Sequence, residues 1–367
     1  GGVSSCHEPI TIQEVIDRLR LGLHVPLRHG SIRKDIGALI PLLKDGKELR
    51  RVMMCTDGVD PKDLARYGYM EWVVQEAINA GLEPIKAIQM ATLNAAEHFA
   101  LDNIIGGIAP GKCADMVLIP DINTIKAQLV ISNGRIVSQN GQILVQPRKH
   151  NFPDWIRQTF KMPRPLTAAD FAIKVGEADG RVKVRVIDYV TDLVTREAQE
   201  EVPVSKGFIA PDTNRDLLKA AAIDRLYRAG QMAVALVRGF KMKKGAFASS
   251  GSWDCAAISV VGANDADMAL AVNRLAEIQG GIILAADGKV IHEVPLPIGG
   301  FLSELPMEIV ANQLNELRRK LGELGCTLPD PHLSLTLLTT AAIPHLRLSE
   351  YGLVNLRDGK SVELVVK

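Results

Sequence analysis

The sequence lacks the features of a secreted or membrane protein. Its five cysteines form no CxxC pair, and an odd number cannot close entirely into disulfides within one chain. It contains no run of about 20 apolar residues that could cross a bilayer, and no charged start followed by an apolar stretch marks a signal peptide. We therefore expect a cytoplasmic protein with no membrane partner.

The sequence also has almost no net charge. Lys and Arg number 43 and Asp and Glu number 42, which gives a formal charge of +1. This balance creates no field that would attract nucleic acid or an anionic surface. With 367 residues and 47% hydrophobic content, the chain is long enough for two or three domains with their own cores. The expected partner is a small neutral molecule, and nucleic acid is not expected.

No local metal-binding motif exists, because the eight histidines form neither an HxH nor an HExxH pair. A lone histidine is usually structural, and this interpretation applies to six of the eight: His24, His98, His150, His292, His332 and His345. Similarly, the lysines of GFKMKKGAF (Lys241, Lys243 and Lys244) favour a solvated loop over a phosphate site.

The first hundred residues alternate short apolar runs with helical patterns, which predicts strand-then-helix units. Thr11 and Glu14 have the spacing of a capping box at a helix start. Pro84 suits the first position of a helix. The expected strands are 25–27 and 51–55, and the expected helices are 11–23, 36–43, 69–80 and one beginning at Pro84.

Polar residues follow the apolar runs, at positions where a parallel barrel builds its active site. His7 and Glu8, the segment 28–31, and Asp57 all lie at such strand ends. A histidine and an aspartate from different strands could bind one metal ion. Alternatively, Glu8 caps a turn and Asp57 begins one. A closed barrel needs about 250 residues, so this region is expected to form only part of one.

The sequence changes character after Ile104, where glycine-rich turns separate short strands. Asn133-Gly134 and Asn140-Gly141 are typical of tight hairpin turns, which predicts a small β module. The segment 149–166 is rich in proline, aromatic and basic residues, and is expected to be a linker. A second α/β region follows, with expected strands 181–187, 233–237, 257–261 and 281–285 and expected helices 265–278 and 307–324.

Several segments resemble the adenine deaminase family of the amidohydrolase superfamily. SSCHEPITIQEVIDRLRLG, PLRHGS and MMCTDGVDPKDL are similar to the last three strands of that barrel, in the order the family uses. EAINAGLEPIKAIQMATLNAAEHFAL and GGIAPGKCADMVLIPD resemble the tail in which amidohydrolases leave the barrel and complete a β sandwich. VVGANDADMALAVNRLAEIQGGIILAADGKV and PLPIGGFLSELPMEIVANQL resemble the additional C-terminal domain of adenine deaminases.

The resemblance covers essentially the whole chain and implies an α/β fold in four parts. Residues 1–100 would be the last three βα units of a (β/α)8 barrel, and 101–148 a β-sandwich segment. A linker at 149–166 would lead to a C-terminal α+β adenine deaminase domain at 167–367. Because the sequence opens Gly-Gly-Val, we expect the family's HxH pair, bridging carboxylate and fifth-strand histidine to precede it.

The implied reaction is the hydrolysis of adenine to hypoxanthine and ammonia in purine salvage. His7 corresponds to the metal-ligand histidine of the sixth strand, and Asp57 to the eighth-strand aspartate that contacts metal and transfers protons. A divalent metal would lower the pKa of a bound water, and Asp57 would pass its proton to the leaving amine. Glu8 would hydrogen-bond or protonate the purine ring.

The loop after the seventh strand is expected to line the substrate pocket through Arg28, Gly30 and Ser31. The complete enzyme is expected to hold two metal ions, manganese or iron, with zinc as an alternative. The chain alone is expected to bind metal poorly and to turn over little adenine. A homo-oligomer is expected, because an incomplete barrel leaves surface to be covered.

Two segments depart from the pattern of this family. Asp57 is followed by Gly58 where many members have a second aspartate, and 253–257 read Trp-Asp-Cys-Ala-Ala where they have His-Asp-Ser-His-Asn. Two alternatives therefore stay open. One is another amidohydrolase acting on a cyclic amide or a different aminopurine, and the other is a non-catalytic module whose C-terminal region mediates assembly.

Overall fold

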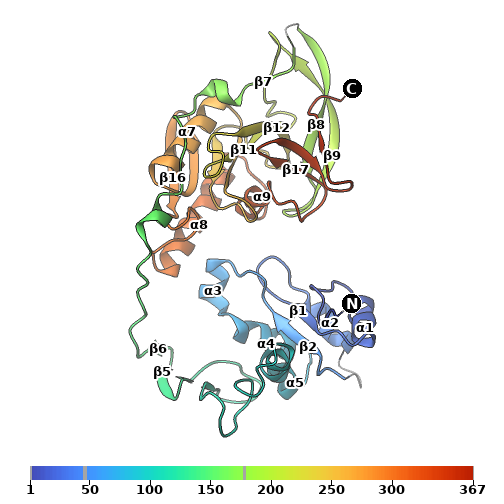
Figure 1. Ribbon diagram of the computed structural model, residues 1–367, viewed down its shortest axis with the longest axis vertical. Coiled ribbons are helices and arrows are strands. Elements are labelled where there is room, and N and C mark those ends of the chain that lie inside the picture. Colours follow the sequence, from blue (N-terminus) through green and yellow to red (C-terminus); the bar gives the residue numbers. More distant parts are fainter. Residues whose placement is uncertain (1, 44–47, 177–178, 367) are drawn as a thin grey trace. The chain divides into compact units, whose positions relative to one another are not determined.

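The computed structural model describes residues 2–43, 48–176 and 179–366. The chain divides into two compact units, Gly1–His150 and Asn151–Lys367 (Figure 1). Within the described residues, no helix is both long enough and apolar enough to span a bilayer.

The first unit opens with parallel strands that are joined by helices. A parallel bridge joins Ser5 to His24, and β1 then pairs in parallel with β2 from Val25↔Val52 to Arg28↔Cys55. In chain order the elements of this unit are α1 (Ile12–Arg20), β1 (Val25–Arg28), α2 (Ile36–Leu43), β2 (Val52–Cys55), α3 (Pro61–Tyr67), α4 (Met70–Asn79), α5 (Pro84–Ala91), α6 (Leu93–His98), β3 (Met116–Leu118), β4 (Leu129–Ser132), β5 (Arg135–Gln139) and β6 (Gln142–Ile143).

The start of α1 follows from its capping residues. The Glu14 backbone N–H donates to Thr11 Oγ1 at 3.3 Å, and the Glu14 carboxylate accepts from the Ile10 and Thr11 backbone N–H groups at 2.8 and 3.1 Å. This confirms the predicted capping box. The helix ends at Arg20 and not near Leu23, because Gly22 takes a left-handed φ of 77°.

The core of the first unit lies between the parallel strands and the helices that cover them. β1 and β2 contribute fully buried Val25, Leu27 and Val52. α2 adds Ile36 and Ile40, and α4 and α5 pack beside β2. Strands that are buried on both faces have continuous apolar sequences. For this reason the sequence predicted β1 and β2 well.

A four-stranded antiparallel sheet, in the order β3-β4-β5-β6, completes the first unit. Ser132 pairs with Arg135 and Gln139 with Gln142, so each hairpin has a two-residue loop. Both residues of each loop have positive φ, for example 48° at Asn133 and 74° at Gly134. These are the turns that the two Asn-Gly pairs predicted.

The second unit is built on an eight-stranded sheet in the order β16-β15-β13-β14-β11-β12-β8-β9. Figure 1 labels β16, β11, β12, β8 and β9 of this sheet. Neighbouring strands are antiparallel except for β12 and β8. The elements are η1 (Asp154–Arg157), η2 (Ala168–Phe171), β7 (Ile173–Lys174), β8 (Gly180–Tyr189), β9 (Thr195–Val204), β10 (Phe208–Ile209), β11 (Leu218–Asp224), β12 (Met232–Arg238), β13 (Ala246–Ser249), β14 (Ala257–Gly262), α7 (Asp265–Glu277), β15 (Gly281–Ala286), β16 (Lys289–Pro295), α8 (Met307–Glu323), α9 (Pro331–Thr336), β17 (Leu346–Ser349), β18 (Gly352–Asn355) and β19 (Lys360–Val362).

Both faces of this sheet are covered, so the unit has three layers. Along β11, Leu218, Ala220 and Ala222 face the core shared with α8, α9 and β17. Ala221 and Ile223 face the opposite core, which contains α7 and η2. This alternation follows from the two-residue period of a strand. An alanine-rich strand has weak β propensity, and its burial on both faces determines its conformation.

The segment expected to be a linker is attached to the second unit. The buried Arg225 side chain donates to the Thr159 carbonyl at 3.1 Å and to Thr159 Oγ1 at 2.7 Å. The Gly299 N–H donates to the Ile156 carbonyl at 2.8 Å. This segment contains the short helix η1 and lacks the regular periodicity of longer elements, as the sequence indicated.

Candidate active site

Three side chains from separate strand ends meet in the first unit. Arg28, the last residue of β1, places Nη1 2.9 Å from Glu8 Oε2 and 2.5 Å from Asp57 Oδ2. Glu8 follows the segment that bridges to His24, and Asp57 follows β2. The parallel pairing brings their carboxyl ends to the same edge, and both carboxylates therefore share one guanidinium.

Burial separates the roles that these groups can take. The side chains of Arg28 and Glu8 are 7% and 5% exposed, whereas that of Asp57 is 44% exposed. Arg33 lies 3.5 Å from the same oxygen of Glu8. Glu8 is thus a buried carboxylate between two arginines, and Asp57 is the more exposed of the two carboxylates.

The backbone at Asp57 forms part of the same arrangement. Asp57 has a φ of 46°, in the left-handed region that short polar residues tolerate. Its carbonyl accepts from Arg28 Nη2 at 3.1 Å. The Arg28 guanidinium therefore contacts both the carboxylate and the backbone carbonyl of Asp57. These two contacts fix the turn that presents the Asp57 carboxylate.

Cys55 packs beneath these carboxylates. Its Sγ lies 3.6 Å from Glu8 Oε1 and 3.8 Å from the Leu27 carbonyl. Burial, followed by the charge of Glu8, raises the pKa of the Cys55 thiol to about 12. The thiol stays protonated at neutral pH, so packing is its role, as the sequence suggested.

The loop after β1 is tied to the loop after β2 through Gly30 and Ser31. A Cβ on Gly30 would lie 2.3 Å from the Thr56 carbonyl oxygen and 2.6 Å from that of Gly58. Ser31 Oγ donates to Asp63 at 2.6 Å and accepts from the Asp60 N–H at 2.8 Å. Both residues therefore have a clear structural role beside their proposed place in the pocket.

His7 is not brought into this cluster. Its side chain is exposed and takes part in none of the ion pairs of Glu8 and Asp57. Among the residues that the structure describes, no group of three or more His, Cys, Asp or Glu side chains could hold a metal ion. A catalytic zinc centre, for comparison, takes three protein ligands. The described residues therefore do not by themselves fit a metal centre, since an arginine holds the carboxylates.

Sequence reasoning missed Arg33, the second cation at Glu8. The segment Ser31 to Arg33 carried no recognisable motif. The contact between Arg33 and Glu8 depends on how this loop folds back, and the Gly30 N–H donates to the Arg33 carbonyl at 2.8 Å. His29, between two candidate residues, is buried edge-on against Trp72 with ring centroids 4.8 Å apart. Burial lowers the pKa of His29, which suits a neutral packing residue.

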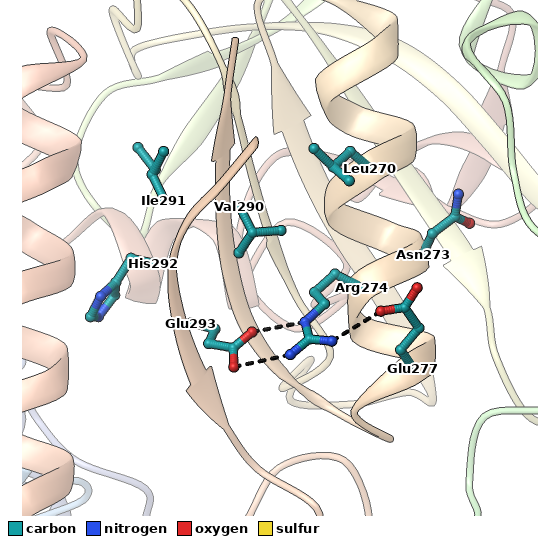
Figure 2. Close-up of a pocket in the computed structure, with 8 residues that line it drawn as sticks. All are labelled: Leu270, Asn273, Arg274, Glu277, Val290, Ile291, His292 and Glu293. Atoms are coloured by element: carbon teal, nitrogen blue, oxygen red, sulfur yellow. Dashed lines mark hydrogen bonds and ion pairs between the residues drawn. The ribbon is translucent and has the colours of Figure 1, made fainter. Parts of the chain in front are cut away.

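The second unit holds a groove between α7 and β16, with a volume of about 530 Å³. Figure 2 shows Arg274 between Glu293 and Glu277, paired with both. Asn273 is bonded to the Leu166 backbone. The groove therefore offers little free polar bonding capacity to a ligand. The variant segment 253–257 lies elsewhere and ends at the first residue of β14, and Cys255 Sγ is 3.5 Å from Thr339 Oγ1.

Two family models match this chain. The amidohydrolase family matches residues 5–137 and the adenine deaminase C-terminal domain matches residues 192–360. The first unit is thus an amidohydrolase-superfamily region with α/β content.

Curated relatives align with this chain over its whole length. An adenine deaminase of Desulforamulus reducens is 39% identical over 368 residues, which is 100% of this chain and 62% of that protein. One of Moorella thermoacetica is 38% identical over 366 residues, covering 99% of this chain and 61% of that protein. The chain is similar to these adenine deaminases along its whole length, and it spans about six-tenths of the length of these relatives.

Among solved structures, a β-aspartyl dipeptidase of Fervidobacterium islandicum matches with a TM-score of 0.31 and 19% identity. The match covers 39% of each chain.

Proposed function

We propose that this chain forms part of an enzyme that hydrolyses adenine to hypoxanthine and ammonia, in purine salvage. The observation that carries this proposal is the meeting of Glu8 and Asp57 on Arg28, at parallel strand ends, in a chain that is similar to adenine deaminases along its whole length. The substrate is a small neutral purine, in keeping with the balanced charge of the chain.

In this proposal, residues 1–100 are the last three units of a (β/α)8 barrel and 101–148 are part of a β sandwich. Segment 149–166 leads to an adenine deaminase domain at 167–367. The parallel β1–β2 pair with its helical crossovers supports the barrel, and the antiparallel sheet of β3 to β6 supports the sandwich. We further propose a homo-oligomeric, cytoplasmic protein.

Asp57 is the proposed proton carrier, because its carboxylate is the exposed one. It would take a proton from the attacking water and deliver it to the amine, which must leave as neutral ammonia. Glu8 is proposed to hydrogen-bond or protonate the purine ring through Oε1, which neither arginine holds and which accepts from the Cys55 thiol at 3.6 Å. Arg28, Gly30 and Ser31 are proposed to shape the pocket wall.

Amidohydrolases are generally metal-dependent, and a divalent ion would supply a bound water of lowered pKa. We propose manganese or iron, with zinc as an alternative, and with His7 and Asp57 among its ligands. The described residues offer these two and do not complete a centre. The 367-residue chain alone is therefore expected to retain little metal and to release little ammonia.

The second candidate is another amidohydrolase reaction, on a cyclic amide or a different aminopurine. Two departures from the family pattern favour it. These are Gly58 after Asp57 and the Trp253 to Ala257 segment. A chimera can separate the two. This chain is joined to the part of the Desulforamulus reducens protein that the alignment does not cover, and ammonia release from adenine is compared with opening of a cyclic ureide.

We expect the chimera to release ammonia from adenine and not to open the ureide ring. Asp57→Asn is expected to lower kcat by more than 100-fold, because one general acid–base group accelerates a reaction by about 10² to 10⁴. The intact relative serves as the positive control, and circular dichroism verifies folding. A folded chimera that opens the ureide and leaves adenine unchanged would refute the proposal in favour of the second candidate.

A further inference from the structure

Two histidines of the first unit are in contact at the strand ends that lie opposite the candidate site. His24 directly precedes β1, and its ring centroid lies 4.7 Å from that of His98, the last residue of α6, with the ring planes tilted by 46°. The sequence predicted a structural role for each histidine taken singly, and the structure brings the two together. We propose that this contact is an acid-sensitive link, which holds α6 against the start of β1 at neutral pH and opens when His98 is protonated.

The surroundings of the His98 ring favour its neutral form. Its Nδ1 atom is buried and has no hydrogen-bond partner among the described residues. Both ring nitrogens of a protonated histidine are donors, so protonation would leave a buried N–H without an acceptor, which is unfavourable. Burial, followed by the charge of His24, lowers the pKa of His98. The folded contact therefore excludes the proton that His98 would otherwise take up in weak acid.

The carboxylate beside this histidine pair is already held by an arginine. Glu97 accepts from Arg50 Nε at 3.0 Å and from Arg50 Nη2 at 2.8 Å, and these bonds lower the pKa of Glu97. Glu97 also interacts electrostatically with His24. It can therefore compensate a charge on His24, whereas the charge that acts on His98 is that of His24 itself.

Other titratable and charged groups from the elements packed around the pair act on its neighbours. Glu48 and Asp102 interact with Arg50. The Cys6 thiol donates to the His24 carbonyl at 3.7 Å, and burial raises its pKa, so it stays neutral in this pH range. Arg51 donates to the Gly22 carbonyl. None of these contacts gives the His98 ring an anionic partner.

The two ends of α6 are attached to different strands. Near its start, the buried Asn94 side chain donates to the carbonyl of Val52, the first residue of β2, at 2.7 Å. At its end, His98 contacts His24, whose backbone N–H donates to the Ser4 carbonyl at 2.9 Å. Loss of the histidine contact would therefore free the end of α6 and the start of β1, while Asn94 keeps the beginning of α6 in place.

The direction of the pH effect follows from the lowered pKa of His98. As the pH falls, a form in which His98 is exposed takes up a proton before the closed form does. The closed form is therefore fully favoured above about pH 6.5, the usual pKa of an exposed histidine, and loses stability as the pH falls below it. The same relation applies to a local opening as to complete unfolding.

The test is hydrogen–deuterium exchange of the full 367-residue chain at about pH 7.5 and about pH 5.5, read by mass spectrometry of peptides and corrected for the intrinsic effect of pH on exchange. We expect the opening of α6 and of the start of β1 to be about fivefold more frequent at the lower pH. One group with an exposed pKa of about 6.5 changes such an equilibrium by at most about tenfold over this range. Peptides of α5 and α7, from the same digest, are expected to change by less than about twofold.

His98→Gln places a polar amide that cannot take up a proton at this position, and we expect it to abolish the response of α6 to pH. The matched control is His292→Gln, at another half-buried histidine on β16 of the second unit, which is expected to leave that response unchanged.

The unmodified chain can decide the matter by itself if His98→Gln does not fold. Equal opening of α6 at the two pH values, or an increase in opening that is as large in α5 as in α6, would overturn the inference. A response that survives in a folded His98→Gln variant would overturn it as well, because another group would then be the one that titrates.

Discussion

At the scale of single residues, the candidate site depends on the close contact between two backbone loops as much as on charge. The loops after β1 and β2 touch at Gly30, where a Cβ would lie 2.3 Å from the Thr56 carbonyl oxygen. Thr56 is itself buried, so neither loop can withdraw without disturbing the strand ends that carry Arg28 and Asp57.

Replacing Gly30 by Ala is therefore expected to lower the free energy of unfolding of the first unit by about 1–3 kcal/mol, the usual cost of overpacking. Urea unfolding followed by circular dichroism measures the change. Gly37→Ala is the matched control, because Gly37 lies in α2 with open space around it. That change is expected to stabilise the helix by about 0.5–1 kcal/mol. Equal stability of the two variants would show that the loops can separate freely.

The residues at this scale also show what the sequence could predict. The positions of Glu8, Arg28 and Asp57 at strand ends followed from local patterns. Their ion pairs did not, because they join residues separated by 20 and 29 positions through the pairing of β1 with β2. The spacing of residues within one segment carries no information about such contacts.

At the scale of elements, the sequence predicted the structure best where turn and cap residues determine the local backbone. The Asn-Gly hairpins and the Thr11 cap required only neighbouring residues. β11 gave no comparable signal, since its alanines suit a helix as readily as a strand. Its place in the middle of the sheet comes from burial on both faces.

The short helix η2 is held by a charged cap that gives a pH dependence. The Asp170 carboxylate accepts from Arg164 Nη1 and Nη2 at 2.9 and 2.6 Å, and from the Thr167 N–H at 2.7 Å. The bonds from Arg164, followed by that from Thr167, hold the pKa of Asp170 well below its usual range. The charged form is therefore favoured by folding.

A group whose pKa is lowered in the folded state stabilises the protein above its unfolded pKa, which is about 3.9 for aspartate. That contribution is lost as the pH falls from there toward the lower folded-state pKa. Asp170→Asn is expected to be less stable than the unmodified chain at pH 7, and the difference should shrink below about pH 4. Urea unfolding of both proteins across this range measures it. A difference that stays constant with pH would contradict the assignment.

At the scale of the whole molecule, the two units have separate hydrophobic cores. The core around β1, β2, α2 and α4 lies entirely in the first unit, and the three cores around the eight-stranded sheet lie entirely in the second. Within the described residues, no hydrophobic cluster contains members of both. The second unit therefore has hydrophobic cores of its own, which is what independent folding as a domain requires.

Residues 151–367 are accordingly expected to fold alone. The isolated segment should unfold in one cooperative calorimetric transition, within a few degrees of a transition of the full chain, because its cores are complete. Removal of one buried contact in it, by Tyr189→Phe at the bond to the Ser334 carbonyl, should lower both transitions equally. A segment with no cooperative transition would mean that its stability depends on the first unit.

This chain is proposed to supply catalytic residues for the hydrolytic deamination of adenine. The most direct measurement follows the chimera in water enriched in oxygen-18, with mass spectrometry of the purine product and an ammonia assay. Hydrolysis places one labelled oxygen in hypoxanthine and releases one ammonia for each adenine consumed, and Asp57→Asn should abolish both signals together. A folded chimera that yields no labelled hypoxanthine, or an Asp57→Asn variant that yields as much as the parent, would contradict the account.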